Sequence, residues 1–381
     1  MAADEETLAP AVAVAQPEYE ERVYVASQWQ LMWWRFRRHR LALVSVVVIV
    51  LIYLVAIFCE FLATYNPNVH NQTYAFAPPQ GLHFIDESGF HLRPFVYGLK
   101  GERDPETRRL VFVPDPSQKY PLRFFVHGEP YKMWGLIPSD LHLLGIEGGK
   151  DATFYLLGTD RLGRDQFSRL VYGTRLSTSI GLVGVTLSFV LGILIGGISG
   201  YYGGSVDNIV QRSIEFLRSI PTIPLWMGLS AALPPHWSPV KVYFGITVIL
   251  SLIGWTGLAR VVRGRFLSLR AEDFVMAARL AGAGEMRIIL RHMVPSFLSH
   301  VIASLTLSIP SMILSETALS FLGLGLRPPA ISWGVLLQEA QNFRSVALAP
   351  WLLTPGLAVV ITVLTFNFMG DGLRDAADPY A

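Results

Sequence analysis

The chain has 381 residues, of which 51% are apolar and only 16% are charged. Soluble globular domains carry about 25% charged residues, so the shortage of charge indicates a membrane protein. The 31 basic and 29 acidic residues nearly balance, which argues against a nucleic-acid-binding protein, because such proteins rely on a basic surface.

Residues 1–40 are predicted to form a cytoplasmic tail. Residues 1–26 lack the basic, apolar and small-residue regions of a secretory signal peptide, so we expect them to be retained. The stretch 28–40, QWQLMWWRFRRHR, places tryptophans beside arginines, as in segments that lie on an anionic membrane surface. Alternatively, it only marks the start of the next helix. In both cases, arginines directly before the first apolar run place the N-terminus in the cytoplasm.

Six apolar runs are long enough to cross about 30 Å of hydrocarbon as helices. They cover residues 41–63, 176–201, 209–233, 242–262, 295–322 and 350–369. The third run carries Arg212, Glu215 and Arg218 in its first half, where long side chains can reach the membrane surface. This topology puts the arginine-rich segment 263–292 inside, in agreement with the positive-inside rule, and it makes the C-terminus cytoplasmic.

Residues 64–170 differ in composition and are predicted to form an external soluble lobe between the first two spans. They carry charges of both signs and many prolines, and they contain no apolar run long enough to span. Residues 109–113 and 122–126 resemble strands bounded by Pro114 and Gly128. The lobe is either a solvated cap over the membrane domain, which is the simpler interpretation, or a docking surface.

The cytoplasmic segment 271–284 is too polar to span and is predicted to form a short helix that contacts another protein. Small and apolar residues recur there at helical spacing, so one face can approach a partner closely. These residues are Phe274, Ala277, Ala278 and Ala281. Gly282 and Gly284 then break the helix. A second helix is expected to follow with Met286, Ile289, Leu290 and Met293 on one face and to end at Pro295. The alternative is an ordinary surface hairpin.

The pattern Ala277-Ala278, three residues, Gly282, nine residues and then His292-Met293-Val294-Pro295 resembles the EAA motif of bacterial ABC importer permeases. Met276 stands in place of the family's glutamate, and His292 and Val294 stand in place of its isoleucine and leucine, as in the peptide-transporter branch. In that family the motif docks into a groove of the ATP-binding subunit. The resemblance therefore implies a coupling role for Glu272, Phe274, Ala277, Ala278, Arg279, Ala281, Gly282, Ala283 and Gly284.

Two further stretches resemble the dipeptide, oligopeptide and nickel importer permeases. Residues 157–169, LGTDRLGRDQFSR, with YGTR at 172–175, are similar to a run that precedes the second span in that family; its motif residues are Gly158, Thr159, Asp160, Gly163, Arg164 and Asp165. Later motifs are LSFLGLG at 319–325, SWG at 332–334 and GDGLRD at 370–375. The resemblance covers residues 30–65 and 155–381, and because the group also moves glycosides and opines, the solute stays open.

The resemblance implies an all-α polytopic membrane protein with the six-helix type I ABC importer permease fold. Residues 171–381 would form its core in the bacterial inner membrane. The implied partners are a second homologous permease, two ATP-binding subunits that hold ATP and magnesium, and an extracytoplasmic solute-binding protein. The residues agree, because the chain has no Gly-x-x-x-x-Gly-Lys-Ser/Thr phosphate loop. They also show no metal-ligand spacing and no Ser-His-Asp or Cys-His arrangement, so neither a metal site nor catalysis is expected on this chain.

Several small and polar residues in the spans are candidates for helix packing or for a solute pathway. Gly192, Gly196 and Gly200 repeat at four-residue spacing, which lets another helix approach closely, either for static packing or for movement. Ser304, Ser308, Ser311 and Ser315 form one polar stripe that either lines a pathway or bonds to a neighbouring helix. Further pathway or gate candidates are Glu316, Met227, Pro221 and Pro224, and Pro310 is a further predicted kink.

An ion-coupled secondary carrier and a membrane receptor are the alternatives. Carriers often show inverted repeats and charges deep in the membrane, and the sequence has no such repeat and few deep charges. A receptor needs a cytoplasmic output domain, and only a short hairpin and two tails are predicted to face inward. Both alternatives predict that uptake, if any, is independent of ATP.

Overall fold

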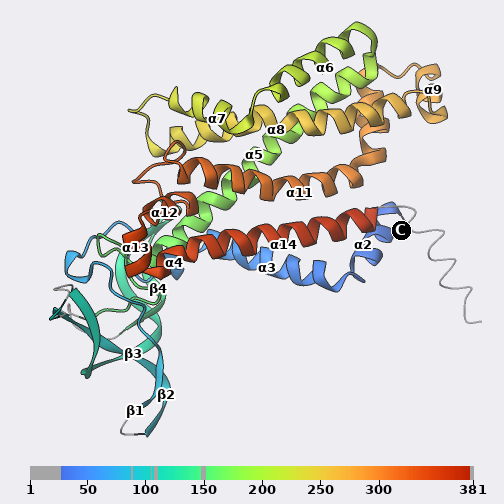
Figure 1. The fold of residues 1–381 in the computed structure, drawn as a ribbon. Helices are drawn as coiled ribbons and strands as arrows, with labels where there is room; N and C mark the ends of the chain where they lie inside the picture. The colour runs from blue at the N-terminus through green and yellow to red at the C-terminus, as the bar shows by residue number, and fades with distance from the viewer. Residues whose placement is uncertain (1–26, 87–88, 104, 107–109, 147–151, 378–381) are drawn as a thin grey trace, which may run out of the picture.

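The computed structural model describes residues 27–86, 89–103, 105–106, 110–146 and 152–377 (Figure 1). Long helices run side by side in a bundle, and a β-sheet lies at one end of this bundle. The short helix at residues 273–280 lies at the opposite end, where the first and last described residues of the chain also lie. Residues 1–26 of the predicted tail lie outside the described residues.

The first helices follow the predicted order. They are α2 (Gln28–Phe36), α3 (Arg40–Ile57) and α4 (Cys59–Leu62). Ser27 and Gln30 form a reciprocal capping box at the start of α2, and the tryptophans of α2 are exposed. The exposed tryptophans agree with an interfacial segment, while α3 provides the apolar length of the first predicted span.

Among the described residues, five helical segments are long and apolar enough to cross a membrane. They are α3, α5 (Gln166–Tyr202), α8 (Pro239–Leu269), the part Val301–Phe321 of α11 (Val294–Phe321), and Pro350–Ala377, which combines η3 (Pro350–Leu353) with α14 (Thr354–Ala377). The α5 helix begins at Gln166 rather than near residue 176, because the Asp165 carboxylate accepts the Ser168 backbone N–H at 2.7 Å and caps it. Pro310 lies inside α11 without ending it.

The third predicted span is not confirmed as a single crossing helix. It consists of α6 (Gly204–Ser219) and α7 (Thr222–Ala231), separated at Ile220 and Pro221, where the backbone is extended. The ring of Pro221 removes a backbone donor and prevents a continuous helix. On α6, Ile214 is buried against Trp255 of α8, whereas Arg212 and Glu215 pair on the exposed side. Charge on α6 and the break together explain why neither helix qualifies as a span.

Together α6 and α7 return the chain from one end of the bundle to the other. Tyr202, at the end of α5, hydrogen-bonds Glu285 beside the short helix at 273–280. The loop after α7, in contrast, shares a cavity with residues 324–330, which follow α11 at the sheet end. The chain thus passes between the two ends of the bundle through two short helices, neither of which is long and apolar enough to count as a span.

The α5 and α8 helices pack backbone to backbone along the predicted glycine stripe. A Cβ atom at Gly196 would lie 2.4 Å from the carbonyl oxygen of Ala259, and one at Gly200 would lie 2.6 Å from Cβ of Phe266. Real side chains do not approach so closely, so only glycine fits at these two positions. The predicted close approach of another helix is confirmed.

Replacing Gly196 with leucine is expected to force α5 away from α8 and to destabilise the protein by about 1–3 kcal/mol or more, because overpacking a tight contact displaces backbone. The matched control is Gly264→Leu on α8, since a Cβ at Gly264 meets nothing within 4 Å. Thermal unfolding of the purified membrane complex measures the stability of each variant. Equal melting temperatures for the two variants would contradict the packing account.

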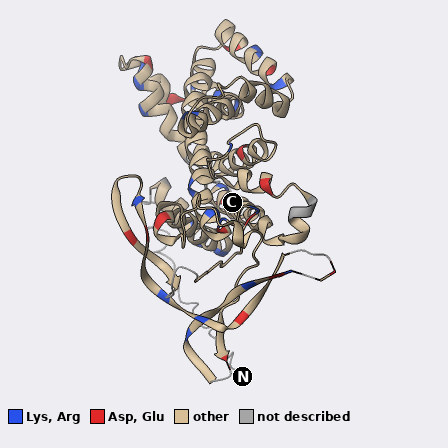
Figure 2. Ribbon diagram, turned by 90° about the vertical axis from the view of Figure 1, so that its left-hand side faces the viewer, with Lys and Arg blue, Asp and Glu red and all other residues tan. Residues whose placement is uncertain are grey.

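The predicted lobe contains a four-stranded antiparallel sheet in the order β1-β2-β3-β4. The strands are β1 (His83–Asp86), β2 (Gly89–Arg103), β3 (Leu110–Met133) and β4 (Ile137–Ile146). Long curved strands extend away from the bundle and carry charges of both signs (Figure 2). The described part of 109–113 and the segment 122–126 both belong to β3, which continues through Pro114 and Gly128, so their predicted bounds are too short.

Candidate functional site

A short helical hairpin lies at the end of the bundle opposite the sheet. It contains α9 (Asp273–Leu280), α10 (Glu285–Arg287) and the π-helical turn η2 (Ile288–Met293). Val275 is fully buried in a cluster with Tyr201 of α5 and Phe266 of α8. The Arg279 guanidinium lies 5.3 Å from the centre of the Tyr201 ring, a favourable cation–π arrangement. The hairpin is therefore attached to the ends of α5 and α8.

Gly282 ends α9 in the way the sequence predicts. Its φ angle is +76°, a left-handed conformation that glycine adopts without strain. The Ala281 and Ala283 N–H groups donate to the carbonyls of Ala277 and Ala278 at 2.9 and 3.0 Å. These bonds close the helix, and the chain turns sharply into Gly284, which has an ordinary extended conformation.

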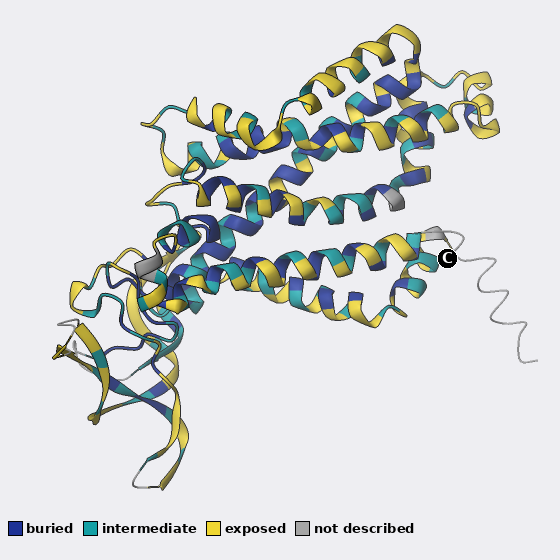
Figure 3. Ribbon diagram, in the orientation of Figure 1, coloured by how far each residue is buried: buried dark blue, intermediate teal, exposed yellow. Residues whose placement is uncertain are grey.

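The outer face of α9 is apolar and open. Figure 3 shows this end as largely exposed, and the exposed apolar residues are Phe274, Met276, Ala277, Leu280 and Ala281. Ala278 and Ala283 are half-buried toward the bundle, whereas Glu272 and Arg279 are exposed beside the open face. Leu280 has 87% of its surface exposed. Leu280 lies in the predicted segment 271–284, but no coupling role was predicted for it from the sequence, because the pattern of small residues did not include it.

The predicted second helix does not end at Pro295. Instead, η2 runs directly into α11, with Pro295 in the first turn of α11, where its missing N–H does no harm. The predicted apolar face is also partly wrong, since Met286 and Leu290 are exposed, whereas Ile289 and Met293 are buried. A π-helical turn holds more residues than an α-helical turn, so the spacing assumed for an α-helix does not apply.

The four predicted serines of α11 line one groove. Ser304, Ser308, Ser311 and Ser315 face a space of about 400 Å³ that is also bounded by α5 and α8 and by Trp226 of α7. The Ser308 and Ser315 hydroxyls donate to carbonyl oxygens one turn earlier, at 2.9 and 2.7 Å. Because these two hydroxyl protons are donated within α11, the Ser308 and Ser315 oxygens can bind a molecule in the groove only as hydrogen-bond acceptors.

Glu316 lies apart from this groove. Its carboxylate is fully buried and accepts hydrogen bonds from Ser320 at 2.8 Å, Ser332 at 2.9 Å and Ser177 at 3.4 Å. Ser177 belongs to α5, and Ser332 caps α12 (Trp333–Glu339). Glu316 therefore joins three helices in the interior at the sheet end of the bundle.

The other pathway candidates surround α7. Pro221 precedes α7, and Pro224 lies in its first turn. Met227 is partly exposed and does not line the groove, whereas its neighbour Trp226 does. The serines and α7 thus border the same groove, and the residue of α7 that lines it is Trp226. The serine pattern in the sequence did not indicate this tryptophan.

Residues of the motif before α5 form a buried network of charges with α12. Arg164 donates to Asp160 at 2.6 Å and to both carboxylate oxygens of Glu339 at 2.9 Å. Arg169 binds the same two carboxylates, with distances of 2.8 and 3.0 Å to Glu339. The four side chains are at most 11% exposed. Glu339 completes this network from far along the chain, which sequence reasoning missed.

The glycines and the threonine of the same motif attach the preceding loop. A Cβ atom at Gly163 would lie 1.8 Å from the carbonyl oxygen of Asn71, and φ is +71° there, so both space and conformation require glycine. Gly158 has a φ angle of +69°, which is also in the left-handed region. The backbone N–H of Thr159 donates to the carbonyl oxygen of Ala77 at 2.9 Å and so attaches the motif to the loop after α4. Burial raises the pKa of the capping Asp165 carboxyl to about 6. The motif therefore organises the junction between sheet and bundle.

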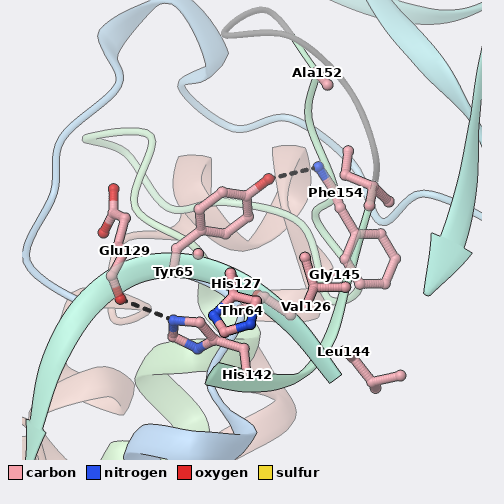
Figure 4. A pocket seen from close by; sticks show the side chains of 12 residues that line it. Thr64, Tyr65, Val126, His127, Glu129, His142, Leu144, Gly145, Ala152 and Phe154 are labelled. Atoms are coloured by element: carbon pink, nitrogen blue, oxygen red, sulfur yellow. Dashed lines mark hydrogen bonds between the residues drawn. The ribbon is translucent and has the colours of Figure 1, made fainter. Parts of the chain in front are cut away.

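A second cavity, of about 180 Å³, lies where the sheet meets the chain after α4 (Figure 4). The Phe154 N–H donates to the Tyr65 hydroxyl at 2.9 Å. The two His142 ring nitrogens lie 2.6 Å from the Ala63 carbonyl oxygen and 3.0 Å from that of Glu129. In the described part of the chain, no three histidine, cysteine, aspartate or glutamate side chains gather as a metal site.

Two family models match this chain. Residues 192–380 match the binding-protein-dependent transport system inner membrane component, and residues 27–79 match the N-terminal TM domain of oligopeptide transport permease C. The first match includes the α9 hairpin, the serines of the groove and α12, and the second includes α2, α3 and α4.

Curated relatives match over most of their length. The dipeptide transport system permease protein DppC of Bacillus subtilis is 37% identical over 58% of this chain and 68% of its own. DppC of Haemophilus influenzae is 31% identical over 92% of this chain and 94% of its own. Among solved structures, an inward-facing MetNI methionine ABC transporter is 21% identical, with a TM-score of 0.44, over 55% of this chain and 96% of that one. The family models and the curated relatives show that the chain belongs to the family of binding-protein-dependent transport system inner membrane components, as a multi-pass permease subunit of an ABC importer.

Proposed function

We propose that the solute is a peptide or a related small molecule and that the chain works with a second, similar permease, two ATP-binding subunits and an external solute-binding protein. The observation that carries this proposal is the open apolar face of α9 on a hairpin that is firmly attached to the bundle. Support for the solute class comes from the names of the relatives, which are dipeptide permeases.

The proposed orientation places the α9 end in the cytoplasm and the sheet outside, in the bacterial inner membrane. Arg263, Arg265 and Arg270 lie at the α9 end of α8, and Arg287 and Arg291 follow in the hairpin. The arginines that precede α3 lie at the same end of the bundle. Basic residues concentrate on the cytoplasmic side of membrane proteins, so both groups of arginines support this orientation, in which the first and last described residues would lie on the cytoplasmic side.

In the proposed mechanism, α9 transmits movement of an ATP-binding subunit to the groove. Val275 and Arg279 fix α9 to the ends of α5 and α8, and the same two helices form the groove walls opposite the α11 serines. A displacement of α9 therefore moves two walls against the third. Two discrete arrangements of packed helices are the usual basis of such switching. ATP and magnesium would bind on the partner subunits, because this chain has no phosphate loop.

Uptake of a labelled peptide into membrane vesicles that contain the complex tests this function. We expect uptake to require both ATP inside the vesicle and an added solute-binding protein, and to be insensitive to the collapse of ion gradients. Uptake driven by an ion gradient without ATP would favour a secondary carrier and contradict the proposal.

A further inference from the structure

The turn between β3 and β4 is attached directly to the end of a membrane span. The indole Nε1–H of Trp134 donates to the carbonyl oxygen of Ile57 at 2.9 Å, and the Trp134 backbone N–H donates to Glu60 at 3.1 Å. Arg175 of α5 holds the same Glu60 carboxylate at 2.5 Å and also donates to Ile57 at 2.9 Å. The turn is therefore fixed in position relative to both α3 and α5.

These contacts define how deep the turn lies. Ile57 is the last residue of α3, and all of α3 qualifies as an apolar span. One side of α3 is exposed along its length through Val44, Val47, Val50, Leu51, Leu54 and Ile57, as expected for a lipid-facing helix. Trp134 is therefore located at the level where the apolar surface of α3 ends.

The turn continues the apolar surface of α3. Trp134, Leu136 and Ile137 are 50%, 78% and 53% exposed. Phe125 of β3 is also exposed, and its ring lies 6.2 Å from that of Phe61 in α4. Water-exposed turns are normally built from polar residues, glycine and proline, and contiguous exposed apolar residues mark a contact surface. Tryptophan is enriched at the boundary between lipid and water.

We propose that the β3–β4 turn inserts its apolar residues Trp134, Leu136 and Ile137 into the lipid leaflet beside α3 and so anchors the sheet to the membrane. The occupant of this surface is lipid because the surface is continuous with the exposed side of α3 at the same depth. Sequence reasoning favoured a fully solvated lobe, whereas this anchor fixes one edge of the sheet at the membrane surface. The anchor depends neither on the solute nor on the partner subunits.

The variant Leu136→Cys, labelled with the polarity-sensitive fluorophore NBD, tests the proposal in the full complex reconstituted in phosphatidylcholine nanodiscs. The native Cys59 is fully buried, so the unsubstituted chain provides the labelling background, and Cys59→Ala is the alternative background. The matched control is Leu92→Cys, because Leu92 is 88% exposed near the start of β2, in the part of the sheet that lies away from the helices. Two quenchers are compared, a lipid with a shallow doxyl group and aqueous iodide.

We expect NBD at position 136 to emit at shorter wavelength, to be quenched by the doxyl lipid and to be protected from iodide. The label at position 92 should show the reverse. Quenching of both labels by iodide alone would place the turn in water and overturn the proposal. Protection of position 136 from both quenchers would show that a protein partner covers the turn, which would also overturn it. Leu136→Asp provides a second readout. If the charge releases the sheet from the membrane, trypsin should cleave the sheet faster in Leu136→Asp than in Leu92→Asp.

Discussion

Replacing Glu339 with glutamine is expected to destabilise the protein by about 3–5 kcal/mol, because removing one partner from a buried charge network leaves the others uncompensated. Glu339 accepts four hydrogen bonds from Arg164 and Arg169. Among the residues that the structure describes, these arginines keep only Asp160 as a charged partner in the variant. The melting temperature of the purified complex should fall strongly, and less complex should be recovered from membranes.

The control for this prediction is an exposed ion pair. Glu215 pairs with Arg212 at 2.8 Å, and the two side chains are 51% and 84% exposed. Glu215→Gln should therefore change stability by less than about 1 kcal/mol. If Glu339→Gln melted at the same temperature as Glu215→Gln, the network would not be what holds α12 to the segment before α5.

Replacing Leu280 with aspartate is expected to abolish coupling without unfolding the chain. Leu280 is 87% exposed, so it contributes little to internal packing, whereas a charge at the centre of an apolar interface is costly to bury. Interface hot spots contribute roughly 2 kcal/mol or more, which corresponds to more than a ten-fold loss of affinity. We expect the ATPase activity of the complex to lose its stimulation by the binding protein, and solute uptake to stop.

Leu92→Asp is the matched control, since Leu92 has nearly the same exposure, 88%, but lies on the sheet. Both variants should reach the membrane at parental levels. Normal uptake by Leu280→Asp, with fully stimulated ATPase activity, would show that the open face of α9 is not the docking surface. Gly282→Leu should also impair coupling, because its φ of +76° strains any other residue.

The sequence patterns correctly predicted those structural features that depend on residues only a few positions apart. The α9 helix, its glycine end and the common face of the four serines all follow from helical spacing and were found in the structure. The glycine stripe of α5 was likewise predicted as a close contact and confirmed. In each case the determining residues are separated by only a few positions, so the backbone geometry of one helix is sufficient to place them.

Features that depend on distant residues or on context could not be predicted. Glu339 meets Arg164 only through the tertiary fold, and no spacing indicates that contact. Pro114 suggested the end of a strand, yet each part of β3 pairs with a single neighbour, β2 before residue 122 and β4 after it. A strand with one free edge tolerates proline. The exposed Leu280 was missed because exposure depends on how α9 is attached to the bundle.

Co-purification from native membranes tests the central claim most directly. The full chain, with an affinity tag at its C-terminus, is extracted in mild detergent, and mass spectrometry identifies and quantifies what elutes with it. We expect a second permease and an ATP-binding subunit in fixed stoichiometry, and loss of the ATP-binding subunit in Leu280→Asp but not in Leu92→Asp. If the chain eluted alone or only with copies of itself, even after crosslinking, its assignment as the coupled permease subunit of an ATP-driven importer would be contradicted.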